Sequence, residues 1–593
     1  MTRVPLRPLA RILDARARGE NPDLIERENL KKRHDEMRDR ARLRAEGRLL
    51  VSALLFFCAF VAVGVRMGAI AGSEPTEPRA ITAGAPIASA RADIVDRSGR
   101  LLATNLVTHA LYAQMRDMVD PARAARELVQ IFPDLDREEL YAKFTGERKF
   151  FWIKKTLSPE QQQQVFDIGE PGLLFGPREM RLYPNGALAS HVLGGTRFGE
   201  EGVNAAEVVG VAGVELAFED RLSDPGQADA PLALTIDLTI QAAVERVLAG
   251  GMQIMNAKGA AATLMDVQTG EIVALASLPD FDPNDRPSPL TKGQPADSPL
   301  FNRAVQGVYE LGSTFKIFAA AQALEMGLVT PDTTIDTQGP IRWGKFKIND
   351  SHRLPAQLSM TDVIVESSNV GTARVAQMIG AERQEIFLRG LGLMDTIPIE
   401  LVEARKAKPL VPERWSELSA MTISYGHGLS VTQLHLAAAY AAMVNGGTRV
   451  TPTLVHRETV EPGERVISSR TSEILRGMLR QVVARGTASY GEVAGYEVGG
   501  KTGTADKPSA TGGYEEDSVI ATFASIFPAS DPKYVLIVTL DDPVDTSGPE
   551  PRRQAGYTAV PVGAEVIRRV APLLGLKPVI DPLAPTGVKL SAN

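Results

Sequence analysis

The chain has 593 residues, a hydrophobic fraction of 44% and a formal net charge of −7 at pH 7. This length exceeds one ordinary domain and the apolar content is ample for sizeable cores, so we expect two or more domains. The acidic balance argues against a nucleic-acid-binding protein. The single cysteine, Cys58, rules out an intramolecular disulfide framework and a cysteine metal cluster, and the seven histidines show no metal-binding spacing such as HExxH. We therefore expect neither a metal nor another cofactor.

A basic segment at the N-terminus precedes an apolar run. Residues 1–48 carry more Arg and Lys than acidic residues, 49–65 are uncharged, and the apolar character continues to 71 if Arg66 snorkels. A helix over 49–71 is long enough to cross a bilayer, and the charge asymmetry places 1–48 in the cytoplasm and the rest of the chain outside it. The alternatives are a cleavable signal peptide, whose basic region would be much shorter, and a buried core helix, which the flanking arginines disfavour.

Residues 72–230 predict a mixed domain in which no chemistry is evident. Its first part, 72–86, is rich in Gly, Pro, Ala and Thr, which is typical of a linker. Local patterns predict a strand hairpin over 92–103 with its turn at Ser98-Gly99, and helices over 121–132 and 158–166.

Residues 231–575 predict an α+β domain, and 576–593 are left as a C-terminal tail. Besides a helix over 238–248, the pattern predicts five strands, over 260–267, 271–277, 498–504, 519–527 and 534–540. The chain between the second and third strands is mostly helical in pattern. The early and late strands must therefore meet across a helical insert, which gives an antiparallel five-stranded sheet flanked by helices.

Ser313 and Lys316 stand three residues apart at the start of an apolar run that favours a helix. In the first turn of such a helix the serine hydroxyl would meet backbone N–H groups, and a lysine removed from water could lose its proton and act as a base. The four-residue pattern is weak alone, since Ser530 and Lys533 repeat it by chance in a turn. Taken alone, Ser313 is more often a helix cap than a nucleophile.

Two further motifs follow in a fixed order, Ser367-Ser368-Asn369 and Lys501-Thr502-Gly503-Thr504. The trio S-x-x-K, S-D-N and K-T-G marks serine β-lactamases and penicillin-binding proteins. Here the middle motif has Ser368 in place of Asp, and S-x-N alone is unspecific because residues 591–593 repeat it. Separately, these motifs are compatible with a turn between helices and with a strand end. Their joint order favours an active site.

With these motifs the chain resembles the class B penicillin-binding proteins, most closely their division-specific (septal) peptidoglycan transpeptidases. The match runs from 91 to about 570 and includes the segments 91–99, 181–184 with His191, 210–215 and 425–432. Two departures, Ala92 for the usual Gly and Leu311 for the usual Pro, touch no reacting group. The resemblance implies one transmembrane helix, an elongated non-catalytic pedestal over 72–230 and a transpeptidase domain over 231–575.

The resemblance also implies a reaction. In such enzymes a donor stem peptide ending in D-Ala-D-Ala acylates the serine, D-Ala leaves, and an amine from a neighbouring stem attacks the acyl-enzyme; β-lactams block the same serine covalently. Ser313 is then the nucleophile and Lys316 its base. Ser367 would relay a proton to the leaving amine, and Asn369 would position both the lysine and the substrate amide.

The last motif is implied to bind the donor. Lys501 would offer positive charge near the terminal carboxylate, with hydrogen bonds from Thr502 and Thr504. Gly503 would keep the strand open for the substrate backbone. The N–H groups of Ser313 and Thr504 would form the oxyanion hole.

By resemblance, the protein sits in the bacterial inner membrane at the division site, with a cytoplasmic N-terminus and a periplasmic catalytic domain. Its partners would be the septal membrane glycan polymerase and other division proteins. Three other functions stay open: an elongation-type transpeptidase, a hydrolase of the β-lactamase kind, and a non-catalytic penicillin sensor or divisome scaffold.

Overall fold

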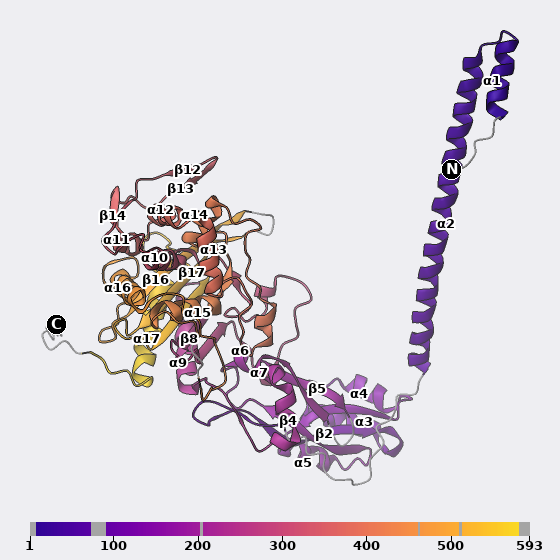
Figure 1. The fold of residues 1–593 in the computed structure, drawn as a ribbon. Helices are drawn as coiled ribbons and strands as arrows, with labels where there is room; N and C mark the ends of the chain where they lie inside the picture. The colour runs from indigo at the N-terminus through magenta and orange to yellow at the C-terminus, as the bar shows by residue number, and fades with distance from the viewer. Residues whose placement is uncertain (1–6, 73–90, 202–205, 460–462, 509–512, 580–593) are drawn as a thin grey trace. The chain divides into compact units, whose positions relative to one another are not determined.

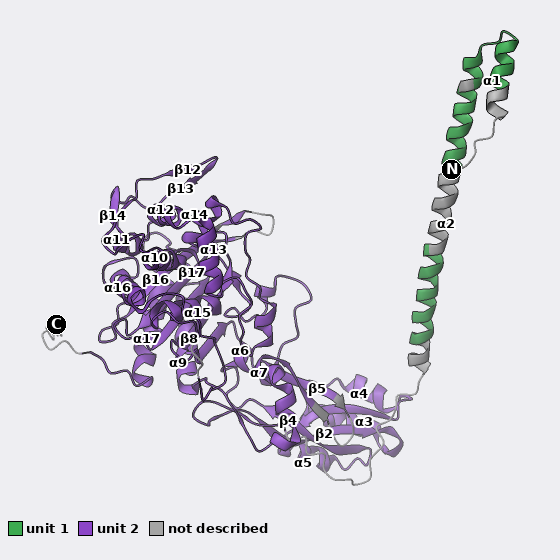
Figure 2. Cartoon of the chain, viewed as in Figure 1, with its two compact units in different colours: residues 1–79 green, residues 80–593 purple. Residues whose placement is uncertain are grey.

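The computed structural model describes residues 7–72, 91–201, 206–459, 463–508 and 513–579, and the chain divides into two compact units, 1–79 and 80–593 (Figures 1 and 2). The first unit contains helix α1 (Arg7–Ala17) and the long helix α2 (Pro22–Gly72). The linker expected over 72–86 lies almost entirely outside the described residues.

The segment 49–71, expected to span the membrane, is helical throughout as part of α2. Its central side chains, 52–67, are described and exposed. The structure does not describe the side chains at the two ends of this segment. Among the residues that it does describe, no helix has the length and apolar character of a membrane span.

The second unit begins with a mixed sheet in which strands pair in the order β3-β2-β1-β7, with β4 also paired to β2. Its strands are β1 (Ile94–Val95), β2 (Leu101–Gln114), β3 (Phe150–Leu157), β4 (Leu173–Leu182) and β7 (Leu232–Ala233). The hairpin turn at Ser98-Gly99 is confirmed. The expected helices are α3 (Pro121–Ile131) and α5 (Pro159–Ile168), and α4 (Arg137–Phe144) lies between them. A hairpin of β5 (Gly195–Glu201) and β6 (Ala206–Ala212) and the short helices α6 (Ser190–Leu193), α7 (Gly213–Ala217) and α8 (Glu219–Leu222) complete this part.

Three of the motifs that carry the resemblance meet in a buried charge network. The guanidinium of Arg91 lies 2.7 Å from Glu215 and 2.9 Å from Glu219, and Arg181 lies 2.7 Å from Glu215. Tyr183 donates to the same Glu215 carboxylate at 3.3 Å. Because a buried charge is costly unless it is paired, these residues are coupled to one another and hold 91, 181–183 and 215–219 together. The motifs therefore have a structural role.

The antiparallel five-stranded sheet predicted over 231–575 is present, in the order β16-β17-β18-β8-β9. Its strands are β8 (Gly259–Asp266), β9 (Ile272–Leu278), β16 (Gly499–Pro508), β17 (Tyr514–Phe527) and β18 (Tyr534–Asp541). The central pairing joins Ile537 of β18 to Thr263 of β8, so the early and late strands meet as expected.

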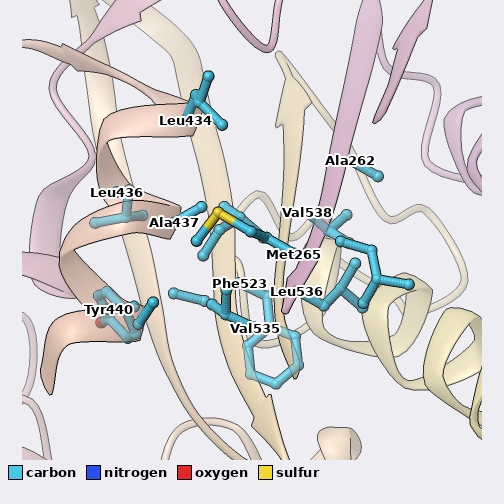
Figure 3. Close-up of a cluster of buried hydrophobic side chains, with 14 of the residues drawn as sticks. Ala262, Met265, Leu434, Leu436, Ala437, Tyr440, Phe523, Val535, Leu536 and Val538 are labelled. Atoms are coloured by element: carbon cyan, nitrogen blue, oxygen red, sulfur yellow. The ribbon is translucent and has the colours of Figure 1, made fainter. Parts of the chain in front are cut away.

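Helices cover both faces of this sheet. Helix α15 (Gln433–Val444) lies against one face, where the Gln433 amide bonds to Ile537 O and Thr539 Oγ1. On the other face α9 (Leu238–Ile254) and α17 (Ala559–Leu573) pack together, and Phe523 lies against Gly563. Figure 3 shows apolar side chains that α15, β8, β17 and β18 contribute to this core. The sheet is thus buried on both sides, and only its edges are available for a site.

The helical insert carries the remaining elements. They are α10 (Lys316–Glu325), α11 (Met360–Val365), α12 (Asn369–Ile379), α13 (Ala381–Gly390), α14 (Glu417–Ser424) and α16 (Ser469–Arg485), with the short strand pairs β10 (Val308–Tyr309) and β15 (Val431–Thr432), β11 (Thr334–Asp336) and β14 (Gln357–Ser359), and β12 (Ile341–Trp343) and β13 (Phe346–Ile348).

Candidate active site

Ser313 lies in a single 3₁₀ turn, Gly312–Phe315, that leads directly into α10. The sequence predicted the first turn of a helix, and the tighter turn places Ser313 just before the α-helix, with Lys316 as its first residue. Gly312 has a φ of 55° and lies so close to β16 that a Cβ would stand 2.6 Å from the carbonyl oxygen of Thr504. Only glycine meets both conditions. The turn is fixed from its other side by the buried Tyr440, whose hydroxyl donates to the Thr314 carbonyl at 2.7 Å.

Two buried lysines converge on Ser367. The Nζ of Lys316 donates to Ser367 Oγ at 3.0 Å and also to the Ser367 carbonyl, and Lys501 Nζ donates to the same Oγ at 2.9 Å. Both lysine side chains are fully buried. The three motifs, far apart in the sequence, therefore share one hydroxyl group. This confirms that the fold brings Lys501 beside the Ser313 helix.

Burial changes the protonation of both amines. It lowers the pKa of Lys316 well below the ordinary value, and the neighbouring Lys501 lowers it further, while Asp350 raises it. Burial lowers the pKa of Lys501 to about 7. Because two ammonium groups on one oxygen repel each other, their titrations are linked. A lower pKa favours the neutral form of the Lys316 amine, and a neutral amine can accept a proton from a nearby hydroxyl group.

The loop 367–369 connects α11 to α12 in a strained conformation. Ser367 has a φ of 60°, and a non-glycine residue in this region costs on the order of 1–3 kcal/mol. Asn369 is the first residue of α12, and its side-chain amide donates to the Asn349 carbonyl at 3.0 Å. The sequence-based expectation was that Asn369 positions Lys316. Over the described residues the Lys316 amine instead bonds to Ser367.

The strand β16 is the outermost strand of its sheet and carries the last motif. The Lys501 amine, besides bonding to Ser367, donates to the Thr502 carbonyl at 3.2 Å and to the Thr502 hydroxyl group at 3.4 Å. The Thr502 hydroxyl group also shares a hydrogen bond of 2.8 Å with Thr487, and the Thr504 hydroxyl accepts from the backbone N–H of Ala555 at 2.9 Å. Close packing explains why position 503 is glycine, because an added Cβ would stand 2.1 Å from the Leu311 carbonyl oxygen. A side chain there would separate β16 from the Ser313 turn.

The motif 425–428 also lies at the site. Its residue pattern provided no reason to expect this motif there. Gly426 has a φ of 91°, and a Cβ there would stand 1.9 Å from the Gly312 carbonyl. The next residues hold Glu310, whose carboxylate accepts from Gly428 N at 2.7 Å and lies 3.2 Å from His427 Nδ1, while Tyr514 donates to it at 3.0 Å. Although burial alone would raise the pKa of Glu310, the hydrogen bonds from His427 and Gly428 hold it below its ordinary value.

Sequence reasoning missed Glu310 and Asp350 as parts of the site. Glu310 stands three residues before Ser313, and a carboxylate this close to a candidate nucleophile was a usable signal. Asp350 reaches the middle motif from a separate loop, and local sequence carries no signal for that contact.

Comparison with known proteins agrees with this geometry. A family model described as the penicillin-binding protein transpeptidase domain matches residues 260–567, and one described as the penicillin-binding protein dimerisation domain matches 86–227. A probable peptidoglycan D,D-transpeptidase FtsI from Caulobacter vibrioides is 34% identical over 91% of this chain and 91% of that protein. Peptidoglycan D,D-transpeptidase FtsI from Escherichia coli K12 is 28% identical over 83% of this chain and 87% of that protein.

Among solved structures, the chain is similar to penicillin-binding protein 3 from Mycobacterium tuberculosis, crystallised with aztreonam. The TM-score is 0.62 at 26% sequence identity, covering 83% of this chain and 97% of that one. The resemblance identified from the motifs is therefore confirmed. With three sequence motifs gathered around Ser367 and 91% of its length aligned to a probable peptidoglycan D,D-transpeptidase, this chain belongs to the penicillin-binding protein transpeptidase family.

Proposed function

We infer that this chain is a peptidoglycan D,D-transpeptidase that cross-links stem peptides of the septal cell wall through a serine acyl-enzyme, with release of D-alanine. One observation carries the chemistry: two buried lysine amines meet on the hydroxyl group of Ser367, beside the turn that holds Ser313. A site of this kind can take a proton from one hydroxyl group and deliver it to a leaving amine without a metal.

In the acylation step Ser313 Oγ attacks the carbonyl carbon of the penultimate D-alanine. The neutral Lys316 accepts the hydroxyl proton, and Ser367, bonded to both lysines, passes a proton to the departing amine of the terminal D-alanine. The N–H groups of Ser313 and Thr504 stabilise the oxyanion. An amine from a second stem peptide then attacks the acyl carbon and frees Ser313.

Donor binding belongs to the last motif. Lys501 supplies positive charge and Thr502 a hydroxyl group for the terminal carboxylate, while Asn369 uses its free carbonyl oxygen for the substrate amide. Gly503 allows β16 to lie against the Ser313 turn, and thereby places Thr504 near the reacting carbonyl. β-Lactams, which resemble the acyl donor, enter the same site and stay on Ser313.

The membrane location and the partners are part of this proposal. Residues 49–71 anchor the chain in the inner membrane with 1–48 in the cytoplasm and the catalytic domain in the periplasm, at the division site. The basic segment that precedes the uncharged run supports this arrangement. The segment 72–230 serves as a pedestal, and the anchor and pedestal contact the septal glycan polymerase and other division proteins.

Labelling with a fluorescent penicillin tests the nucleophile. The variant S313A should lose the covalent label, whereas S530A, which alters the serine of the chance motif at 530–533, should label like the wild type. A persistent label on S313A would refute the assignment of Ser313. Rapid turnover of the penicillin by the wild type would favour a hydrolase.

Depletion in cells tests the division role. Filaments without septa support it, and swollen, rounded cells would move the protein to cell elongation. Acylation without any cross-linking of a pentapeptide-bearing glycan would favour a sensor or scaffold.

A further inference from the structure

The loop 367–369 keeps a backbone conformation that a serine adopts only when its surroundings impose it. Ser367 has a φ of 60°. On one side the amines of Lys316 and Lys501 hold its hydroxyl group. These contacts fix the side chain of Ser367, but they leave the next two residues of the loop unheld.

Asp350 holds those residues from a separate loop. Its Oδ1 accepts the backbone N–H groups of Asn369 at 2.5 Å and Val370 at 3.1 Å, and its Oδ2 accepts the hydroxyl group of Ser368 at 3.0 Å. The carboxylate thus satisfies the first N–H groups of α12 and places a negative charge at the positive end of that helix.

Ser368 is also where this chain departs from the S-D-N pattern. In that pattern the carboxylate belongs to the middle residue of the motif. Here Ser368 is fully buried, donates to Asp350 and accepts from Gly371 N at 2.9 Å. The motif therefore receives from Asp350 a carboxylate that it does not contain.

Asp350 acts on Lys316 through its charge as well. Burial lowers the pKa of the Lys316 amine most and Lys501 on β16 lowers it too, whereas Asp350 raises it. Two other titratable side chains on these segments, His352 and Glu366, lie 3.9 Å from each other. Removing the charge of Asp350 would therefore leave the Lys316 ammonium with less stabilisation.

We propose that Asp350 is a positioning residue of this enzyme: it holds the loop 367–369 so that Ser367 stays beneath both lysines, and its negative charge tunes the amine of Lys316. It contacts no reacting atom, and its effect passes through Ser368, Asn369 and Lys316. The inference rests on the proposed function, because it assigns a further residue to the same acylation step.

The test measures the rate of acylation by a fluorescent penicillin from about pH 5 to pH 9 on the full-length protein in detergent, with D350N as the variant. Asparagine keeps the shape of the side chain but removes the charge and one acceptor. We expect the rate at neutral pH to fall at least about 10-fold and the acidic limb of the profile to move to lower pH. D336N is the matched control: Asp336 of β11 pairs with Arg374 of α12 at 3.0 Å, and the variant should behave like the wild type.

A rescue separates positioning from general damage to the fold. The double variant D350N/S368D places a carboxylate in the middle of the motif, as in S-D-N. It should recover at least half of the decrease in the logarithm of the acylation rate that D350N causes. Circular dichroism and the Tm verify folding. A D350N profile with an unmoved acidic limb, or a rate within twofold of the wild type, would overturn the proposal. S313A in the same assay keeps the two inferences apart, since only a persistent label there contradicts the proposed function.

Discussion

A methyl group at position 503 should both destabilise the catalytic domain and slow its reaction. In G503A the new Cβ would stand 2.1 Å from the Leu311 carbonyl oxygen and 2.8 Å from Thr314 Cγ2. To reach an acceptable contact distance, β16 and the Ser313 turn would have to move apart by about 1 Å or more. Neither side yields easily, because Gly503 is paired to Thr522 of β17, and Tyr440 holds Thr314.

Overpacking of this kind costs about 2 kcal/mol, which corresponds to a decrease in Tm of about 3 °C for a domain of the length of 231–575. The reaction is more sensitive, since a misplacement of about 1 Å can cost on the order of 10²-fold in rate. We expect that loss in the second-order rate constant of acylation by a fluorescent penicillin, with Tm measured on the same preparation.

The control is G477A in the middle of α16, where a Cβ meets nothing within 4 Å and alanine favours the helix. This variant should keep its Tm or gain stability, and it should react normally. If G503A keeps Tm within 1 °C and its acylation rate within about threefold, the packing of β16 on the Ser313 turn does not control the geometry of the site.

Two other variants probe the lysines and the anchor of the turn. K501M should lower the acylation rate by about 10²-fold. It should also move the acidic limb of the pH profile to higher pH, because the neighbouring ammonium that lowers the pKa of Lys316 is gone. An acidic limb that stays in place or moves to lower pH would contradict the coupling between the two lysines. Y440F leaves the buried Thr314 carbonyl without its partner, which costs about 1–3 kcal/mol and should lower Tm by about 1–4 °C in a thermal melt. A Tm equal to that of the wild type would mean that the hydrogen bond does not fix the turn.

The fold of the catalytic domain was largely predictable because its elements have strong local patterns. The strands expected over 519–527 and 534–540 are the cores of β17 and β18, and β-branched and aromatic runs of this kind have few alternatives. Element ends were less predictable. The strand expected over 498–504 continues as β16 to Pro508, and β17 begins already at Tyr514, because cross-strand pairing extends a hairpin beyond its apolar residues.

By itself, the sequence predicted which residues would carry the chemistry. The order of Ser313, Lys316, the motif at 367–369 and Lys501 was enough to predict a serine acyl-enzyme, because this set of side chains has few other uses. The pattern also predicted that early and late strands share one sheet, since the strands at both ends of the insert had to find partners.

Only the tertiary structure decided how these groups work on one another. That both lysines meet on Ser367, that Gly503 serves the packing of β16, and that Asp350 and Glu310 support the site all depend on contacts between segments far apart in the chain. The protonation of Lys316 also depends on the tertiary structure. An isolated lysine is a cation at neutral pH, and the low pKa of Lys316 arises from complete burial beside a second amine. Desolvation and charge proximity are properties of the folded neighbourhood, which a local pattern of residues does not specify.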